Sequence, residues 1–166
     1  MKNVFLSTPL NLSDKQRKFY ENFCEFLRDY KSINPITVGK NAYTQGNLIE
    51  FIKETILYDC VGMIILALKK ENTSNVGCWN QLEAGIALGA HMPIFRIAEE
   101  GMNMDGVFDN KNGLGPCEVL NINQSKPWLK QPSFSQTFDQ WKNDVEKYSK
   151  VHPEMRNFFQ NAKSCF

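Results

Sequence analysis

The sequence contains few of the residues from which metal centres and disulfide-stapled folds are built. It has two histidines and five cysteines, and no pair of cysteines has the C-x-x-C spacing. An odd number of cysteines without that spacing argues against both a disulfide framework and a zinc site. We therefore expect reduced thiols, no bound metal and a cytoplasmic location.

Long apolar runs and a dominant charge are also missing. No stretch approaches the ~20 apolar residues that cross a bilayer, and the run at residues 4–6 is too short for a signal peptide. The formal net charge is +1, which gives no electrostatic attraction to nucleic acid. Neither a membrane nor a nucleic acid is therefore expected as a partner.

Several catalytic motifs do not occur. The absence of G-x-G-x-x-G and of a P-loop argues against a Rossmann dehydrogenase and a nucleoside-triphosphate hydrolase. No G-x-S-x-G elbow surrounds Ser7, so Ser7 is not expected to be a hydrolytic nucleophile. Cys78 has no histidine near it in the sequence, and a buried thiol is expected there rather than a nucleophile.

Short apolar runs alternate with amphipathic segments along the 166 residues, which we expect to form a single domain, 1–166. Strands are expected at residues 4–6, 35–38, 61–68, 93–97 and 118–122. Helices are expected after capping boxes at 13–16 and 47–50, at 79–88 with Gly89 as its cap, and around 134–148.

This alternation predicts an α/β fold of the flavodoxin-like, doubly wound kind. We expect a mostly parallel open sheet of about five strands with helices on both faces. The continuous apolar run at 61–68 is typical of a central strand, and 98–116 is expected to be a surface excursion. Ligands of such sheets bind at the carboxyl ends of the strands, which here include residues 7–8, 39–46 and 69–79.

Trp79 and Glu83 are the strongest candidates for a functional site. They stand one helical turn apart at the start of the helix that follows the central strand. Glu83 can stabilise positive charge at an anomeric carbon, as carboxylates do in glycoside hydrolysis, and Trp79 can stack on a base. Leu82 and Ile86 are expected to place this side of the helix near the core. A solvated Glu83 and a core Trp79 also fit the spacing.

Further substrate-binding side chains are expected at the ends of the first two strands. The first strand offers Phe5, Ser7 and Thr8. The loop at 39–46, a candidate gate over the site, offers Asn41 and Gln45 for hydrogen bonds to a ribose and Tyr43 for stacking. A plain connecting loop is the alternative for this segment.

These residues resemble the TIR (Toll/interleukin-1 receptor) domain family in its bacterial enzymatic branch. Trp79 and Glu83 match the spacing of the family's S-x-W-C-x-x-E signature, but Gly77 stands in place of serine and Asn80 in place of cysteine. Other similar segments are the first strand at 4–7, the BB loop at 39–46, the central strand at 59–66 and the strand at 93–95. The resemblance covers a motif-bearing core, 1–97, and leaves 98–166 as a variable loop, edge strand and C-terminal helix.

The resemblance implies cleavage of the nicotinamide–ribose bond of NAD⁺, with Glu83 as the catalytic residue and NAD⁺ as substrate rather than cofactor. It also implies a homo-oligomer. In bacterial relatives it implies antiphage defence, either by depleting NAD⁺ or by making a cyclic or linear ADP-ribose signal for a downstream effector protein.

Two other functions stay open. The segment Glu83-Ala84-Gly85 also fits the E-x-G segment of nucleoside 2-deoxyribosyltransferases, which have a similar architecture. That family usually has an aspartate where this chain has Gly77, which favours the TIR resemblance. The third possibility is a non-enzymatic assembly or sensor module, which would explain the degenerate signature and the aromatic C-terminus.

Overall fold

The computed structural model describes residues 1–39, 47–70, 73–112, 114–115, 117–124 and 128–151. Five strands form one sheet in the order β2-β1-β3-β4-β5, and every pairing is parallel. The strands are β1 (Lys2–Ser7), β2 (Ile33–Ile36), β3 (Met63–Ala67), β4 (Ile94–Glu99) and β5 (Cys117–Leu120). This strand order is that of a flavodoxin-like, doubly wound fold, so the predicted fold class is confirmed.

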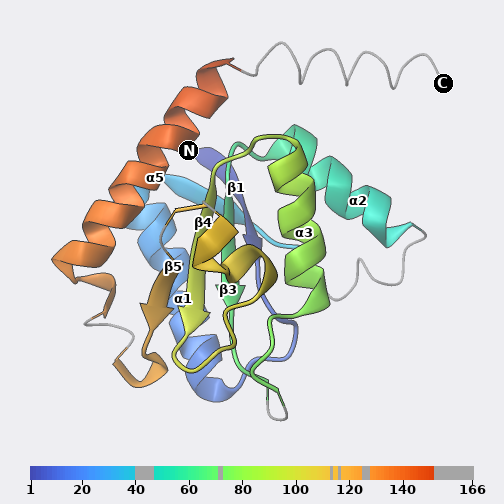
Figure 1. The fold of residues 1–166 in the computed structure, drawn as a ribbon. Coiled ribbons are helices and arrows are strands. Elements are labelled where there is room, and N and C mark those ends of the chain that lie inside the picture. Colours follow the sequence, from blue (N-terminus) through green and yellow to red (C-terminus); the bar gives the residue numbers. More distant parts are fainter. Residues whose placement is uncertain (40–46, 71–72, 113, 116, 125–127, 152–166) are drawn as a thin grey trace.

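Helices cover both faces of the sheet (Figure 1). On one face lie α1 (Asp14–Lys31) and α5 (Pro132–Val151), and on the other lie α2 (Leu48–Glu54), its π-helical extension η2 (Thr55–Asp59) and α3 (Cys78–Gly89). The central strand β3 is buried along its whole length, with Ile64 and Leu66 in one apolar core and Met63, Ile65 and Ala67 in the other. The continuous apolar run at 61–68 predicts this burial on both faces.

The first helix begins at the predicted capping box and is tied to the carboxyl edge of the sheet. Ser13 accepts a hydrogen bond from the backbone of Gln16, and Gln16 accepts one from the backbone of Ser13. The buried amide of Gln16 also donates to the Lys69 carbonyl and to the Glu99 carboxylate, each at 2.8 Å. The first turn of α1 is therefore held against the ends of β3 and β4.

Several predicted boundaries are wrong, among them the end of the last strand, which is Leu120 and not residue 122. Two of the differences have a clear structural reason. The second strand begins and ends two residues earlier than the predicted 35–38, because buried Ile33 pairs with Lys2 at its start. Gly89 does not cap α3: it is the last helical residue, and His91 takes the left-handed conformation with φ 54°. The amide of Met92 donates to the Ala87 carbonyl at 2.9 Å, and the amide of His91 donates to the Leu88 carbonyl. These two bonds form the Schellman motif, which commonly ends a helix.

The prediction of a surface excursion at 98–116 is wrong for part of that segment. Met102 and Phe108 are buried in the apolar core beside α3. Arg96, fully buried on β4, donates to the carbonyls of Val107 and Gly115. These contacts fold the segment back against α3 instead of leaving it in solvent.

Within the described ranges, no helix combines the length and apolar character needed to cross a membrane.

Candidate active site

Three buried side chains form a hydrogen-bonded chain at the carboxyl edge of the sheet. Ser7 is the last residue of β1, while Asn80 and Glu83 lie in the first two turns of α3. The Ser7 hydroxyl donates to a carboxylate oxygen of Glu83, and the Asn80 amide donates to the Ser7 oxygen at 2.7 Å. We call this group the Asn80–Ser7–Glu83 chain. It brings a carboxylate to the edge at which ligands of this fold bind.

The environment of Glu83 opposes its ionisation. Its side chain is 6% exposed. Burial raises the pKa of Glu83 from 4.5 to about 7, and the hydrogen bond from Ser7 lowers it in part. Both the neutral and the charged carboxyl are therefore populated near neutral pH, which is the range in which a catalytic carboxyl is useful.

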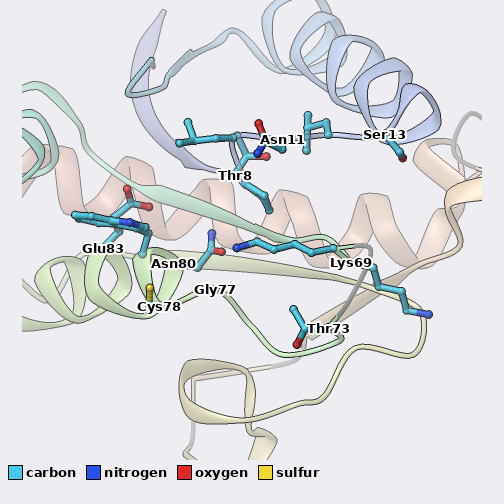
Figure 2. A pocket seen from close by; sticks show the side chains of 14 residues that line it. Thr8, Asn11, Ser13, Lys69, Thr73, Gly77, Cys78, Asn80 and Glu83 are labelled. Atoms are coloured by element: carbon cyan, nitrogen blue, oxygen red, sulfur yellow. The ribbon is translucent and has the colours of Figure 1, made fainter. Parts of the chain in front are cut away.

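Glu83 lines two hollows that meet beside it. The larger hollow, about 710 Å³, lies between the β1–α1 loop, the side chains of Lys69, Lys70 and Thr73, and the start of α3. The smaller hollow, about 260 Å³, lies between the end of β1, α1 and residues 37–39. Figure 2 shows Glu83 and Asn80 on α3, with Thr8 and Asn11 of the β1–α1 loop on the opposite side of the larger hollow. A carboxylate between two hollows can act on a bond whose two halves occupy them.

Thr8 offers an unsatisfied hydrogen-bonding group at the same place. It lines both hollows, and its buried hydroxyl has no partner within the described part of the chain. Leaving a buried hydroxyl unpaired costs about 1–3 kcal/mol. Because the hydroxyl oxygen is itself buried, a ligand hydroxyl in either hollow would relieve that cost only after Thr8 turns toward it.

An aromatic ring on α3 and two lysines also line the larger hollow. Trp79 is 37% exposed and lines this hollow, so it is not a core tryptophan. Lys69 and Lys70 are the lining lysines, and the Lys70 ammonium lies 3.8 Å from where a Cβ atom on Gly77 would be. These side chains can stack on a base and attract phosphate.

The structure brings together some of the predicted site residues and leaves others apart. Ser7, Thr8 and Glu83 meet as expected, whereas Phe5 is buried in the apolar core and reaches only the smaller hollow. The predicted gate and its candidates, Asn41, Tyr43 and Gln45, lie outside the described residues, so their role stays a prediction.

Two predictions about α3 are wrong. Cys78 is exposed rather than buried, because it is the first residue of the helix and lines the larger hollow. Leu82 is 39% exposed and does not mark the core side. The buried face of α3 instead consists of Asn80, Glu83, Ala84 and Ala87.

The sequence reasoning missed Asn80. A signal was available, since Asn80 stands three residues before Glu83 and therefore on the same helix face. Gly77 belongs to the same arrangement, because a Cβ atom there would lie 3.0 Å from the Asn80 side-chain oxygen. The two departures from the TIR signature, Gly77 and Asn80, are thus in contact range.

Among the described residues, no three histidine, cysteine or acidic side chains are grouped to hold a metal ion.

No family model matches the chain, and no curated protein matches it. One similar solved structure is a conserved protein from Enterococcus faecalis V583, with 16% sequence identity and a TM-score of 0.49, covering 87% of this chain and 99% of that one. A likeness this distant carries no conclusion about function.

Proposed function

We propose that the protein cleaves the N-glycosidic bond between a ribose and a base, with Glu83 as the catalytic carboxylate and NAD⁺ as its substrate. One observation carries this proposal: Glu83 is buried at the carboxyl edge of the sheet and faces both hollows while holding a hydrogen bond to Ser7. The resemblance to enzymatic TIR domains implies the same reaction and the same residue.

The chemistry needs one charge at one place. When the C1′–N bond of NAD⁺ breaks, its electron pair goes to the positively charged ring nitrogen, and nicotinamide leaves as a neutral molecule. Positive charge then develops on the ribose, where an ionised Glu83 can stabilise it in a site largely shielded from water. Water adds to C1′ and gives up a proton, which completes hydrolysis. No acid is required for the leaving group.

A neutral nucleoside makes a different demand, because its base leaves more easily after gaining a proton. The nucleoside 2-deoxyribosyltransferase alternative usually supplies an aspartate, and Gly77 stands at that position here. Glu83 cannot hold a proton for the base and stabilise the ribose as an anion at the same time. This difference supports NAD⁺ over a neutral nucleoside.

The larger hollow supports a substrate with phosphate groups. Its volume of about 710 Å³ lies within the usual range for small-molecule sites. In this proposal the Thr8 hydroxyl binds the ribose, Trp79 stacks on a base, and Lys69 and Lys70 attract the pyrophosphate.

Self-assembly is part of the same proposal. Four exposed apolar side chains lie on the two helices of one face, Ile49 and Phe51 on α2 and Trp79 and Leu82 on α3. Such side chains favour contact between subunits. We propose a homo-oligomer whose ADP-ribose product is read by an effector in antiphage defence. Light scattering of the purified protein, with and without NAD⁺, tests the assembly.

The activity is tested by incubating the purified protein with NAD⁺ and a panel of nucleosides and nucleotides, and by identifying the products by mass spectrometry. We expect nicotinamide release by the wild type and none by Glu83→Gln. Glu25→Gln, which removes an exposed carboxylate from α1, is the matched control and should keep full activity. Full activity of Glu83→Gln would overturn the assignment. Self-association without turnover would favour the assembly module instead.

A further inference from the structure

We propose that Asn80 is a positioning residue, which acts through Ser7 to keep the Ser7 hydrogen on Glu83 and so holds Glu83 in its reactive, ionised form. That the ionised form of Glu83 is the reactive one rests on the proposed function. The effect of Asn80 on the charge of Glu83 depends only on the three residues of the Asn80–Ser7–Glu83 chain. Asn80 touches no reacting atom in this account.

The direction of the two hydrogen bonds follows from donor chemistry. The amide nitrogen of Asn80 can only donate, so the Ser7 oxygen must accept from it at 2.7 Å. Ser7 has a single hydrogen, and that hydrogen goes to the Glu83 carboxylate. All three side chains are buried, with exposed fractions of 4% for Asn80, 2% for Ser7 and 6% for Glu83. The hydroxyl of Ser7 is therefore not free to turn toward solvent.

This arrangement matters because it opposes the effect of burial. Burial raises the pKa of Glu83, and the hydrogen bond from Ser7 lowers it. The titratable and charged groups around the two hollows are Arg17, Tyr20 and Glu21 of α1, Lys69 and Lys70 after β3, and Cys78 of α3. None of them is a cause of the pKa shift of Glu83, which results from burial, which raises the pKa, and from the Ser7 hydrogen bond, which lowers it. Ser7 is thus the contact that favours the charged carboxylate.

Gly77 makes room for Asn80. Because a Cβ atom at position 77 would lie 3.0 Å from the Asn80 oxygen, a side chain there would push the amide away from its place. The backbone of Gly77, with φ −62° and ψ 141°, is open to any residue, so the need for glycine comes from this contact and not from conformation. The two positions at which this chain departs from the TIR signature, Gly77 and Asn80, therefore fit each other: the glycine leaves the space that the Asn80 amide occupies.

The decisive variant is Asn80→Asp, which keeps the shape and reverses the hydrogen-bonding role. An aspartate can only accept, so it would draw the Ser7 hydrogen away from Glu83. The readout is the titration midpoint of the Glu83 carboxyl, followed by ¹³C NMR and assigned by its loss in Glu83→Gln. We expect the midpoint to move to higher pH. Where activity is present, the rising limb of its pH profile should move to higher pH by the same amount. At a pH below the midpoint, each pH unit of this shift lowers the rate about tenfold.

Three companion variants separate this effect from charge and from misfolding. Asn11→Asp adds the same charge to the same hollow without a recorded contact to Ser7, and its effect on the midpoint should be smaller. Ser7→Ala should raise the midpoint, and adding Asn80→Asp to it should raise it by less than Asn80→Asp does when Ser7 is present. Asn80→Ala only removes the donor and should also raise the midpoint, which decides the matter if Asn80→Asp does not fold.

Two results would overturn the role of Asn80. One is an unchanged Glu83 midpoint in the Asn80 variants. The other is a shift from Asn80→Asp that is as large without Ser7 as with it, since Asn80 would then act by charge alone. The NMR measurement needs no substrate. A protein that cleaves nothing therefore refutes the proposed function, while the midpoint alone decides the positioning role.

Discussion

Ser7 and Glu83 stand 76 residues apart in the sequence and share a buried hydrogen bond. The bond joins the end of β1 to the second turn of α3, so the sheet topology itself places the serine against the carboxylate. It also connects the raised pKa of Glu83 to a specific neighbour, and this makes the electrostatics of the site open to experiment.

The first prediction concerns the pH dependence of stability. The folded-state pKa of Glu83, about 7, lies above the ordinary 4.5, so the folded protein holds this proton more tightly than the unfolded chain. The resulting stabilisation is fully present below pH ~4.5 and is lost as the pH rises through ~7, by about 3 kcal/mol in total. Glu83→Gln lacks this ionisation and should be more stable than wild type at pH 8 by up to ~3 kcal/mol. Urea unfolding at pH 5 and pH 8 measures the difference, and a gap that does not grow with pH would contradict it.

The second prediction concerns the pH dependence of turnover. If the charged form of Glu83 stabilises the ribose cation, NAD⁺ cleavage should rise with pH and level off above the pKa of Glu83, about 7. At pH 5 the rate should be about one hundredth of the plateau. Nicotinamide release under saturating NAD⁺ measures this profile. A rate that falls as the pH rises through 7 would instead assign Glu83 the role of an acid, as cleavage of a neutral nucleoside requires.

The third prediction concerns the contact between Gly77 and Asn80. Gly77→Ala should destabilise the protein by about 1 kcal/mol, because the new methyl group crowds the Asn80 oxygen. In an Asn80→Ala background the same change should cost much less, which a double-mutant cycle of unfolding free energies detects.

Gly85→Ala is the control for that cycle. Gly85 lies in the same helix, and a Cβ atom there would meet nothing within 4 Å. This substitution should stabilise the protein by about 0.5–1 kcal/mol. An equal cost of Gly77→Ala with and without the Asn80 side chain would show that the crowding does not involve Asn80.

The fourth prediction concerns the cations of the larger hollow. Lys70→Ala should raise the KM for NAD⁺ about fivefold, the value of a modest exposed ionic contact, and leave kcat almost unchanged. Nicotinamide riboside has no phosphate, so its KM should stay the same. Lys147→Ala, at an exposed position of α5, controls for the change in net charge. Equal KM changes for both substrates would place Lys70 away from the phosphates.

Much of the fold could be predicted because it follows from local patterns. The apolar run at 61–68 predicts the central strand, and the Ser13 capping box predicts the start of α1. Phe108 shows the limit: the apolar residues of its mostly polar segment have neither helical nor strand spacing, so nothing local predicts that it packs beneath α3. The sequence also does not predict that His91 takes the left-handed conformation at the end of α3. Glycine is the residue type that usually takes this conformation, so Gly89 is predicted there instead.

The candidate site could be predicted only in part. Glu83 was identified from its spacing to Trp79, but helical spacing alone does not show which face of α3 is buried, and Leu82 was placed on the wrong one. Asn80 belongs to the site because it donates a hydrogen bond to Ser7, which lies 73 residues earlier in the chain. A contact between the end of one strand and a helix two strands later becomes visible only when the sheet order is known.

The double hydrogen bond from Gln16 to the Lys69 carbonyl and the Glu99 carboxylate has a mechanical consequence. Moving the first turn of α1, with its capping residue Ser13, away from the sheet would require these bonds to break. The α1 end of the rim of the larger hollow is therefore anchored to two neighbouring strand ends at once, so a movement of the first helical turn would also disturb the ends of β3 and β4.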